Sequence, residues 1–73
     1  MNKGITLKVG GRHKTRAGYV AEITAFDENP FRVFPWRGTI QIGPRFEKVS
    51  WTLRGRGTGD YTDDPIDLME ELT

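Results

Sequence analysis

Apolar and polar residues alternate along several short stretches of the chain, which is the pattern of half-buried β-strands. The clearest stretch covers residues 49–53, directly before the glycine-rich segment 54–60. We expect Val49, Trp51 and Leu53 to face a core, with the two polar residues between them facing water. Because tryptophan removes more apolar area from water than any other residue, we expect Trp51 to nucleate the packing.

Similar patterns predict further strands at residues 5–9, 12–15, 19–26, 31–34 and 39–42. Glycine, proline and acidic residues between these stretches predict turns, with Gly18 at positive φ in the first hairpin. The inward face of residues 19–26 stays open, because apolar side chains lie on both sides of that stretch. Proline removes a hydrogen-bond donor from a sheet, so the extended segment expected at residues 31–34 is either an edge strand or ends at Pro35.

A different pattern predicts a short helix over residues 64–72. Asp64 is a typical N-cap, Pro65 suits the first helical position, and Asp67 follows three residues after the cap. The apolar residues of this segment recur at helical spacing and form one stripe. A helix of about two turns is not stable alone, so we expect this stripe to dock on the sheet. Its members are Ile66, Met69 and Leu72, with Leu68 beside them.

These elements predict a single, mainly β domain over residues 1–73. The expected architecture is a small SH3-like or open β-barrel of five to six strands, completed by the C-terminal helix. Seventy-three residues allow one domain at most, and no linker or internal repeat interrupts the chain.

Composition restricts the chemistry and the compartment. The chain has no cysteine, which excludes disulfides and suits a reducing cytoplasm. No apolar run approaches the roughly 18 residues that a membrane-spanning helix requires. We therefore expect a cytoplasmic protein without a membrane interaction.

Charge is distributed unevenly, although the net charge is only +1. Residues 1–20 hold five basic and no acidic side chains, whereas residues 57–73 hold six acidic and no basic ones. Such asymmetry is typical of a binding face for a charged partner, and equally of two segments that lie together and attract each other.

The order of several motifs resembles that of small phage and prophage proteins. Residues 10–18 follow a G-G-(K/R)-(Y/H)-x-T-R-x-G start, a Trp-Thr strand follows at Trp51, and residues 64–68 resemble the S-P-x-D-L ending of that group. The chain departs from the pattern at His13, in its longer turn after Trp51, and in the extra strand expected before Gly10. The resemblance implies a mobile-element origin and a compact β fold, and it carries over no catalytic residue.

Nothing in the sequence predicts an enzyme. His13 is the only histidine, no nucleophile is marked as its partner, and we expect it to be exposed on a strand. Asp60, Asp63 and Asp64 match no cation-binding loop, and no glycine pattern matches a phosphate-binding loop. We therefore expect no cofactor, no metal and no small-molecule substrate.

Two kinds of macromolecular partner remain, and a protein partner is slightly favoured. Aromatic and arginine side chains cluster in the middle of the chain, a composition typical of protein interfaces, and self-association into a dimer fits as well. The predicted protein-binding residues are Phe31, Arg32, Phe34, Trp36 and Arg37.

The alternative is a small β-barrel that binds single-stranded or duplex nucleic acid. Basic side chains alternate along one predicted strand and one turn, and exposed aromatic residues would stack on bases. The predicted nucleic-acid-binding residues are Arg12, Lys14, Arg16, Arg54 and Arg56, with Tyr19, Phe34, Trp36 and Tyr61 as stacking platforms.

Overall fold

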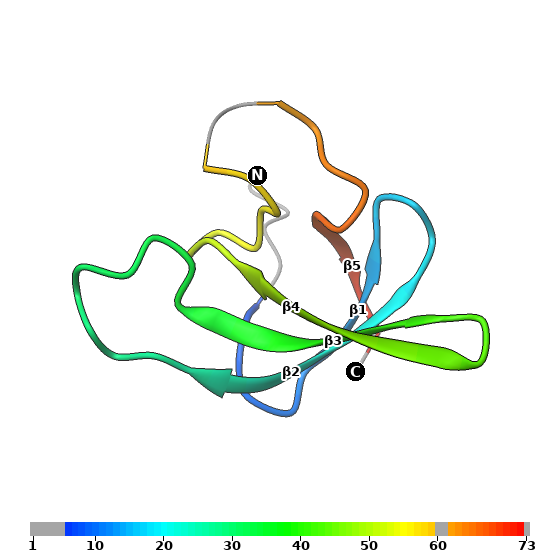
Figure 1. Cartoon of the computed structure of the whole chain (residues 1–73), viewed down its shortest axis with the longest axis horizontal. Helices are drawn as coiled ribbons and strands as arrows, with labels where there is room; N and C mark the ends of the chain where they lie inside the picture. The colour runs from blue at the N-terminus through cyan, green and yellow to red at the C-terminus, as the bar shows by residue number, and fades with distance from the viewer. Residues whose placement is uncertain (1–5, 60–61, 73) are drawn as a thin grey trace.

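The computed structural model describes residues 6–59 and 62–72, which form one antiparallel sheet of five strands (Figure 1). The strands run across the sheet in the order β4-β3-β2-β1-β5. Since β4 and β5 are the two edges, the sheet is not closed into a barrel. The expected mainly β class is confirmed, with five strands, whereas the expected barrel is not formed. The strands are β1 (Arg12–Thr15), β2 (Val20–Phe26), β3 (Trp36–Ile42), β4 (Arg45–Trp51) and β5 (Leu68–Glu71).

Tight turns with glycine at positive φ connect the two hairpins; the sequence predicts both turns, and positive φ at Gly18. Between β1 and β2, Gly18 has a φ of 93° and its N–H donates to the Thr15 carbonyl at 2.9 Å. Between β3 and β4, Gly43 has a φ of 60°, and Ile42 and Arg45 are partners on either side of the two-residue turn. Only glycine adopts these φ values without a steric cost, so the local sequence determines where the chain reverses.

A close approach of backbones defines the centre of the sheet. Gly38 on β3 pairs with Ile23 on β2, immediately before a register shift between Ile23 and Ala25. A Cβ atom at position 38 would collide with the backbone carbonyl of Glu22. The absence of a side chain at Gly38 therefore allows β2 and β3 to pair beside the bulge.

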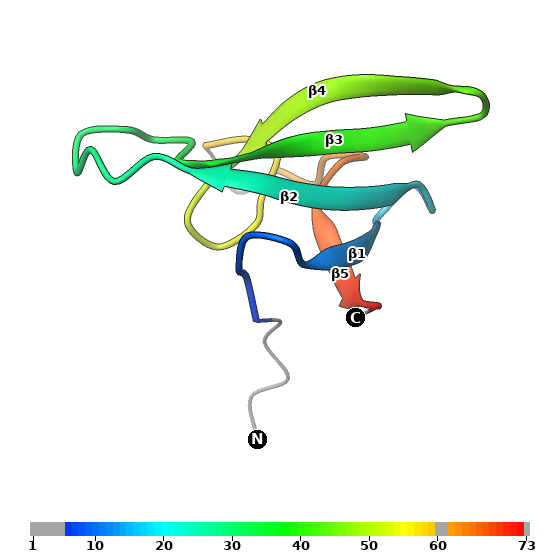
Figure 2. The same cartoon turned by 90° about the horizontal axis from the view of Figure 1, so that it is seen from below.

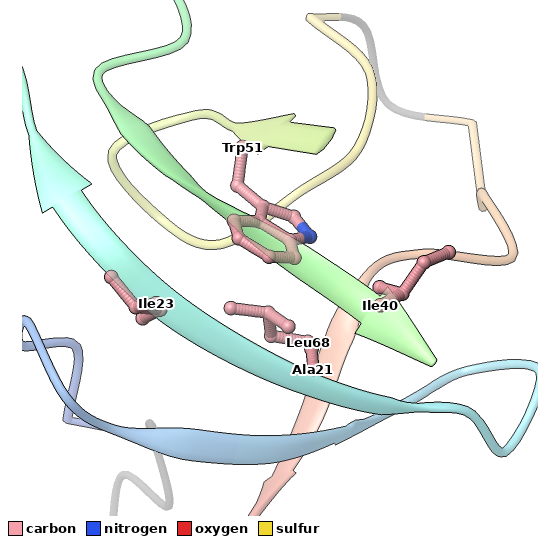
Figure 3. Packing of buried hydrophobic residues seen from close by; sticks show 5 residues of the cluster. All are labelled: Ala21, Ile23, Ile40, Trp51 and Leu68. Atoms are coloured by element: carbon pink, nitrogen blue, oxygen red, sulfur yellow. The ribbon is translucent and has the colours of Figure 1, made fainter. Parts of the chain in front are cut away.

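The core lies against one face of the sheet and is centred on Trp51 (Figure 3). Figure 3 shows the indole of Trp51 pointing toward Ala21 and Leu68, with Ile23 and Ile40 on either side. All five side chains are buried. The indole N–H donates to the carbonyl of Ile66 at 2.8 Å, so the ring is buried without an unpaired donor. The expectation that Trp51 organises the packing is confirmed.

The expectation that Leu53 faces the core is wrong. Leu53 is 65% exposed, because β4 ends at Trp51 and the alternation of inward and outward side chains ends with it. The next backbone N–H, that of Thr52, donates to the carbonyl of Arg56 at 2.8 Å, which bends the chain away from the sheet.

Two other expected strands are wrong. Residues 6–9 form no strand, Val9 is exposed, and the Gly10 N–H donates to the Ile23 carbonyl at 2.7 Å, so pairing with β2 begins only there. Ile5 lies outside the described residues. Residues 31–34 form a loop, and β3 begins at Trp36 instead. The prolines at both ends of this loop supply no donor to a ladder, so the loop closes on itself by side-chain hydrogen bonds.

The predicted helix over residues 64–72 is also wrong, because its backbone carbonyls are bound elsewhere. The carbonyl of Pro65 accepts from Ala17 N–H at 3.0 Å, that of Ile66 from the Trp51 indole, and that of Asp67 from Arg16 N–H at 2.8 Å. A helix would need these three oxygens for its own N–H groups four residues later. The described part of the chain contains no helix, and residues 68–71 pair with β1 instead.

Candidate functional site

The sheet has two faces with different roles. Residues opposite each other in an antiparallel pair share a face, so the partners Ile40 and Glu47 lie on the core side, and the partners Thr39 and Lys48 lie on the other side. We call this second side the outer face. It carries exposed or half-buried side chains from every strand.

The loop between β2 and β3 projects from the end of the sheet (Figure 1). Together with the outer faces of β3 and β4 it encloses a hollow of about 700 Å³. Residues with hydroxyl groups line it from the strands, and they are Thr24, Thr39 and Ser50. Apolar and cationic side chains line it as well, namely Phe31, Val33 and Phe34 together with Arg32, Arg37 and Lys48.

Hydrogen bonds within this loop hold Phe31 outward. The N–H of Asn29 donates to Asp27 Oδ1 at 3.0 Å, and the N–H of Phe31 donates to Asn29 Oδ1 at 3.0 Å. The N–H of Asp27 donates to the Pro35 carbonyl at 2.8 Å, which closes the loop at its base. Phe31 itself is 90% exposed. The loop is therefore an ordered platform that presents a large apolar side chain to solvent.

The hollow is electropositive. Asp27 Oδ2 accepts ion pairs from Arg32 Nε at 3.0 Å and Arg37 Nη2 at 3.3 Å. The Asn29 N–H, followed by the two guanidinium groups, holds the pKa of Asp27 below its usual value despite partial burial. Among the described residues, no carboxylate lies within 4.0 Å of Lys48. The three cationic side chains of the hollow are thus accompanied by one carboxylate, that of Asp27, which pairs with two of them.

Four of the five predicted protein-binding residues line this hollow, and Trp36 does not. Trp36 is half-buried on the core face, where its indole N–H donates to the Leu53 carbonyl at 3.2 Å and its ring lies 4.4 Å from that of Phe26. Sequence reasoning missed Lys48 and the three hydroxyl residues that line the hollow. The alternation that directs Val49 and Trp51 toward the core places Lys48 on the opposite face, and this signal could have identified it.

A second hollow, of about 710 Å³, lies on the other side of Val33. Leu53 and Arg54 contribute to it, and both are exposed. Val33 and Leu53 are both exposed apolar side chains. The apolar surface around the loop therefore extends beyond the first hollow, which Lys48 lines.

Two of the predicted nucleic-acid-binding residues are used inside the fold. Arg16 donates to Asp67 Oδ2 from Nε at 3.2 Å and from Nη2 at 3.1 Å. Arg56 Nε lies 3.6 Å from the same oxygen. Asp67 is fully buried, so these arginines compensate its charge instead of facing a ligand.

Backbone donors complete the environment of Asp67. The N–H of Gly57 donates to Oδ1 at 2.7 Å and the N–H of Asp64 donates to Oδ2 at 3.0 Å. Burial raises the pKa of Asp67, but these two amides and the arginines Arg16 and Arg56 outweigh it, so the pKa lies below its ordinary value. The acidic C-terminal segment and the basic N-terminal segment therefore attract each other within the fold, as one of the two interpretations of the charge pattern predicts.

The remaining basic candidates are exposed. Arg12 and Lys14 project from β1 on the outer face, and Arg54 lies in the turn after β4. The aromatic candidates are not grouped with them, since Tyr19 is half-buried and packs against the core. Tyr61 lies outside the described residues.

The expectation that His13 is exposed is wrong. Its side chain is fully buried opposite Ala21, and Nε2 lies 3.2 Å from the Thr6 carbonyl oxygen. The basic residues of β1 do occupy one face, as predicted, so His13 and Thr15 are the inward pair. Within residues 6–59 and 62–72 no group of three or more potential ligands is placed to hold a metal ion. The same residues include no helix long and apolar enough to span a bilayer.

No family model, curated protein or solved structure matches this chain.

Proposed function

We propose that the chain is a non-enzymatic binding protein that holds a protein partner at the hollow beside the β2–β3 loop. The observation that carries this proposal is the 90% exposure of Phe31 on a loop that hydrogen bonds hold in place. Exposed aromatic side chains next to arginine are typical of the residues that dominate protein interfaces. An ordered loop also loses little conformational freedom when a partner binds.

The proposal includes a cytoplasmic location and the mobile-element origin that the resemblance to phage and prophage proteins implies. It includes no catalytic step, no cofactor and no small-molecule substrate. A dimer of this chain is compatible with the proposal only if the hollow remains accessible.

The test compares two exposed apolar side chains. Phe31 lines the hollow, whereas Met69 is 48% exposed on β5, at the opposite edge of the sheet. We expect Phe31→Ala to weaken partner binding by about tenfold or more, and Met69→Ala to leave it unchanged. Neither change should alter the free energy of unfolding by more than about 0.5 kcal/mol, because both side chains are exposed.

The measurement is quantitative affinity purification from a nuclease-treated bacterial lysate, followed by titration of the captured protein against each variant. Equal capture by the wild type and Phe31→Ala would contradict the proposal. So would capture that disappears on nuclease treatment.

Nucleic-acid binding is the second candidate, and the exposure of Arg12 and Lys14 favours it. No carboxylate of the described residues lies within 4.0 Å of either side chain. Affinity for a labelled single-stranded oligonucleotide should then fall steeply from low to moderate salt. The double variant Arg12→Ala with Lys14→Ala should abolish it. Absence of any oligonucleotide binding at low salt would remove this candidate.

A further inference from the structure

The free edge of β4 is available for pairing with another strand. Ile42 and Arg45 flank a two-residue turn and therefore form a hydrogen-bonded pair. Counted from Arg45, every second residue of β4 points its N–H and C=O groups toward β3. The residues between them direct their N–H and C=O groups away from the sheet. These outward residues are Phe46, Lys48 and Ser50.

Within the described residues no strand covers this edge. β4 is the last strand of the sheet and pairs with β3 along its whole length of seven residues. Figure 2 shows β4 at the rim of the molecule, with no other segment beyond it. An edge of this length with unpaired backbone groups is a template for β-augmentation.

The free edge and the hollow meet at the same residues. Lys48 and Ser50 present their backbone groups to the edge and their side chains to the hollow. A segment paired with β4 would place every second side chain on the outer face, directly beside Lys48. The backbone pairing and the contacts in the hollow are therefore made by one extended ligand.

The charge of the hollow specifies the chemistry of that ligand. Arg32 and Arg37 share the single carboxylate of Asp27, and Lys48 has no carboxylate within 4.0 Å among the described residues. We propose that an extended acidic segment of the protein partner adds to the β4 edge as a sixth strand and places a carboxylate beside Lys48 and Arg37. This inference rests on the proposed function, because it describes how that partner binds.

A second copy of this chain is a poorer occupant of the edge. The outer face of β4 carries Phe46, Lys48 and Ser50, none of which is acidic. Pairing two β4 strands would bring further positive charge to the hollow and would leave its cations uncompensated.

The test begins with random peptides of about a dozen residues, long enough to cover the edge, displayed on phage and selected on the full chain. We expect enriched peptides that contain glutamate or aspartate and lack proline. The best peptide is then synthesised, and amide hydrogen exchange of the protein is measured by NMR with and without it. The amides of Phe46, Lys48 and Ser50 should exchange at least about tenfold more slowly in the complex.

Three variants separate the two parts of the proposal. Ser50→Pro removes an outward donor without disturbing the ladder to β3, and Lys48→Glu reverses the charge in the hollow. Each of these two variants should weaken the affinity for the peptide by about tenfold or more. The matched control is Arg45→Glu, which makes the same charge reversal on β4, but on the core side and outside the hollow. It should leave the affinity unchanged, and circular dichroism confirms that each variant is folded.

Several results would overturn the inference. Selection that enriches no acidic peptide would do so, as would unprotected β4 amides, equal affinity of Lys48→Glu and Arg45→Glu, or a stable dimer of the chain that protects the same amides. A partner that requires Phe31 but binds Ser50→Pro and Lys48→Glu normally would leave the proposed function intact and reject β-augmentation. A preference for oligonucleotides over every selected peptide would reject both.

Discussion

Asp67 shows how a single buried charge connects three segments of the chain. Its carboxylate accepts hydrogen bonds from the backbone of Gly57 and Asp64 and from the side chain of Arg16. A buried carboxylate is stable only when its charge and its lone pairs are both satisfied. The sequence suggested a helix-capping role for this residue, because it follows Asp64 at the spacing of a capping box. Only the folded chain brings Arg16 and Gly57 to it.

Substitution Asp67→Asn should destabilise the fold by roughly 2–4 kcal/mol at neutral pH. The amide removes the charge that compensates Arg16, and its NH₂ group would face backbone donors. Urea unfolding measures the change. The matched control is Asp63→Asn, whose side chain is 69% exposed and lies 3.4 Å from Arg16. This exposed pair should contribute less than about 1 kcal/mol. Equal losses for the two variants would contradict the role of Asp67.

At the scale of elements, β5 forms where local sequence favoured a helix. Strand β1 offers an unpaired edge, and the β5 residue Leu68 reaches the core when the segment is extended. The free energy gained by pairing with β1, which is far away in the sequence, and by burying Leu68 exceeds that of a two-turn helix. Such a helix has little stability of its own. The two conformations differ at Met69, which the helix stripe would bury and the strand leaves exposed, whereas Leu68 is buried in the strand.

This difference predicts unequal effects of two alanine substitutions. Leu68→Ala should destabilise the protein by roughly 2–4 kcal/mol, because it leaves a cavity beside Trp51. Met69→Ala should change stability by no more than about 0.5 kcal/mol, because Met69 is 48% exposed. Thermal unfolding of both variants checks the prediction. A larger loss for Met69→Ala would favour the helix.

At the scale of the whole molecule, the basic start and the acidic end of the chain are adjacent strands. Lys14 lies opposite Glu70 in the backbone register of β1 and β5, and Arg16 forms an ion pair with Asp67. The fold therefore neutralises part of its own charge asymmetry. The basic residues that remain exposed on the outer face are those available to a partner, among them Lys48.

Acid should unfold the protein through the same cluster. The pKa of Asp67 in the folded chain is lower than its ordinary value of 3.8. Its contribution to stability is therefore complete above about pH 3.8 and is lost as the pH falls from there through the folded pKa. Denaturant midpoints measured at several acidic pH values should drop in this window. Because Asp67→Asn has no such carboxylate to protonate, its midpoint should fall less steeply. Parallel curves for the two proteins would show that other carboxylates control acid unfolding.

The sequence by itself determined the class of the fold, most of its strands and its turns. Alternating apolar residues and glycines at reversals act over a few neighbouring positions, so they are visible without the structure. The same local signals located Trp51 in the core and four of the residues around the hollow.

Only the tertiary structure decided where the chain departs from its local preferences. The burial of His13, the extended form of β5, the exposure of Leu53 and the environment of Asp67 all depend on partners far away in the sequence. The free β4 edge is likewise a property of strand order, which no local pattern encodes. Long-range pairing and burial decide these features, because their free energies exceed the small propensities of short segments.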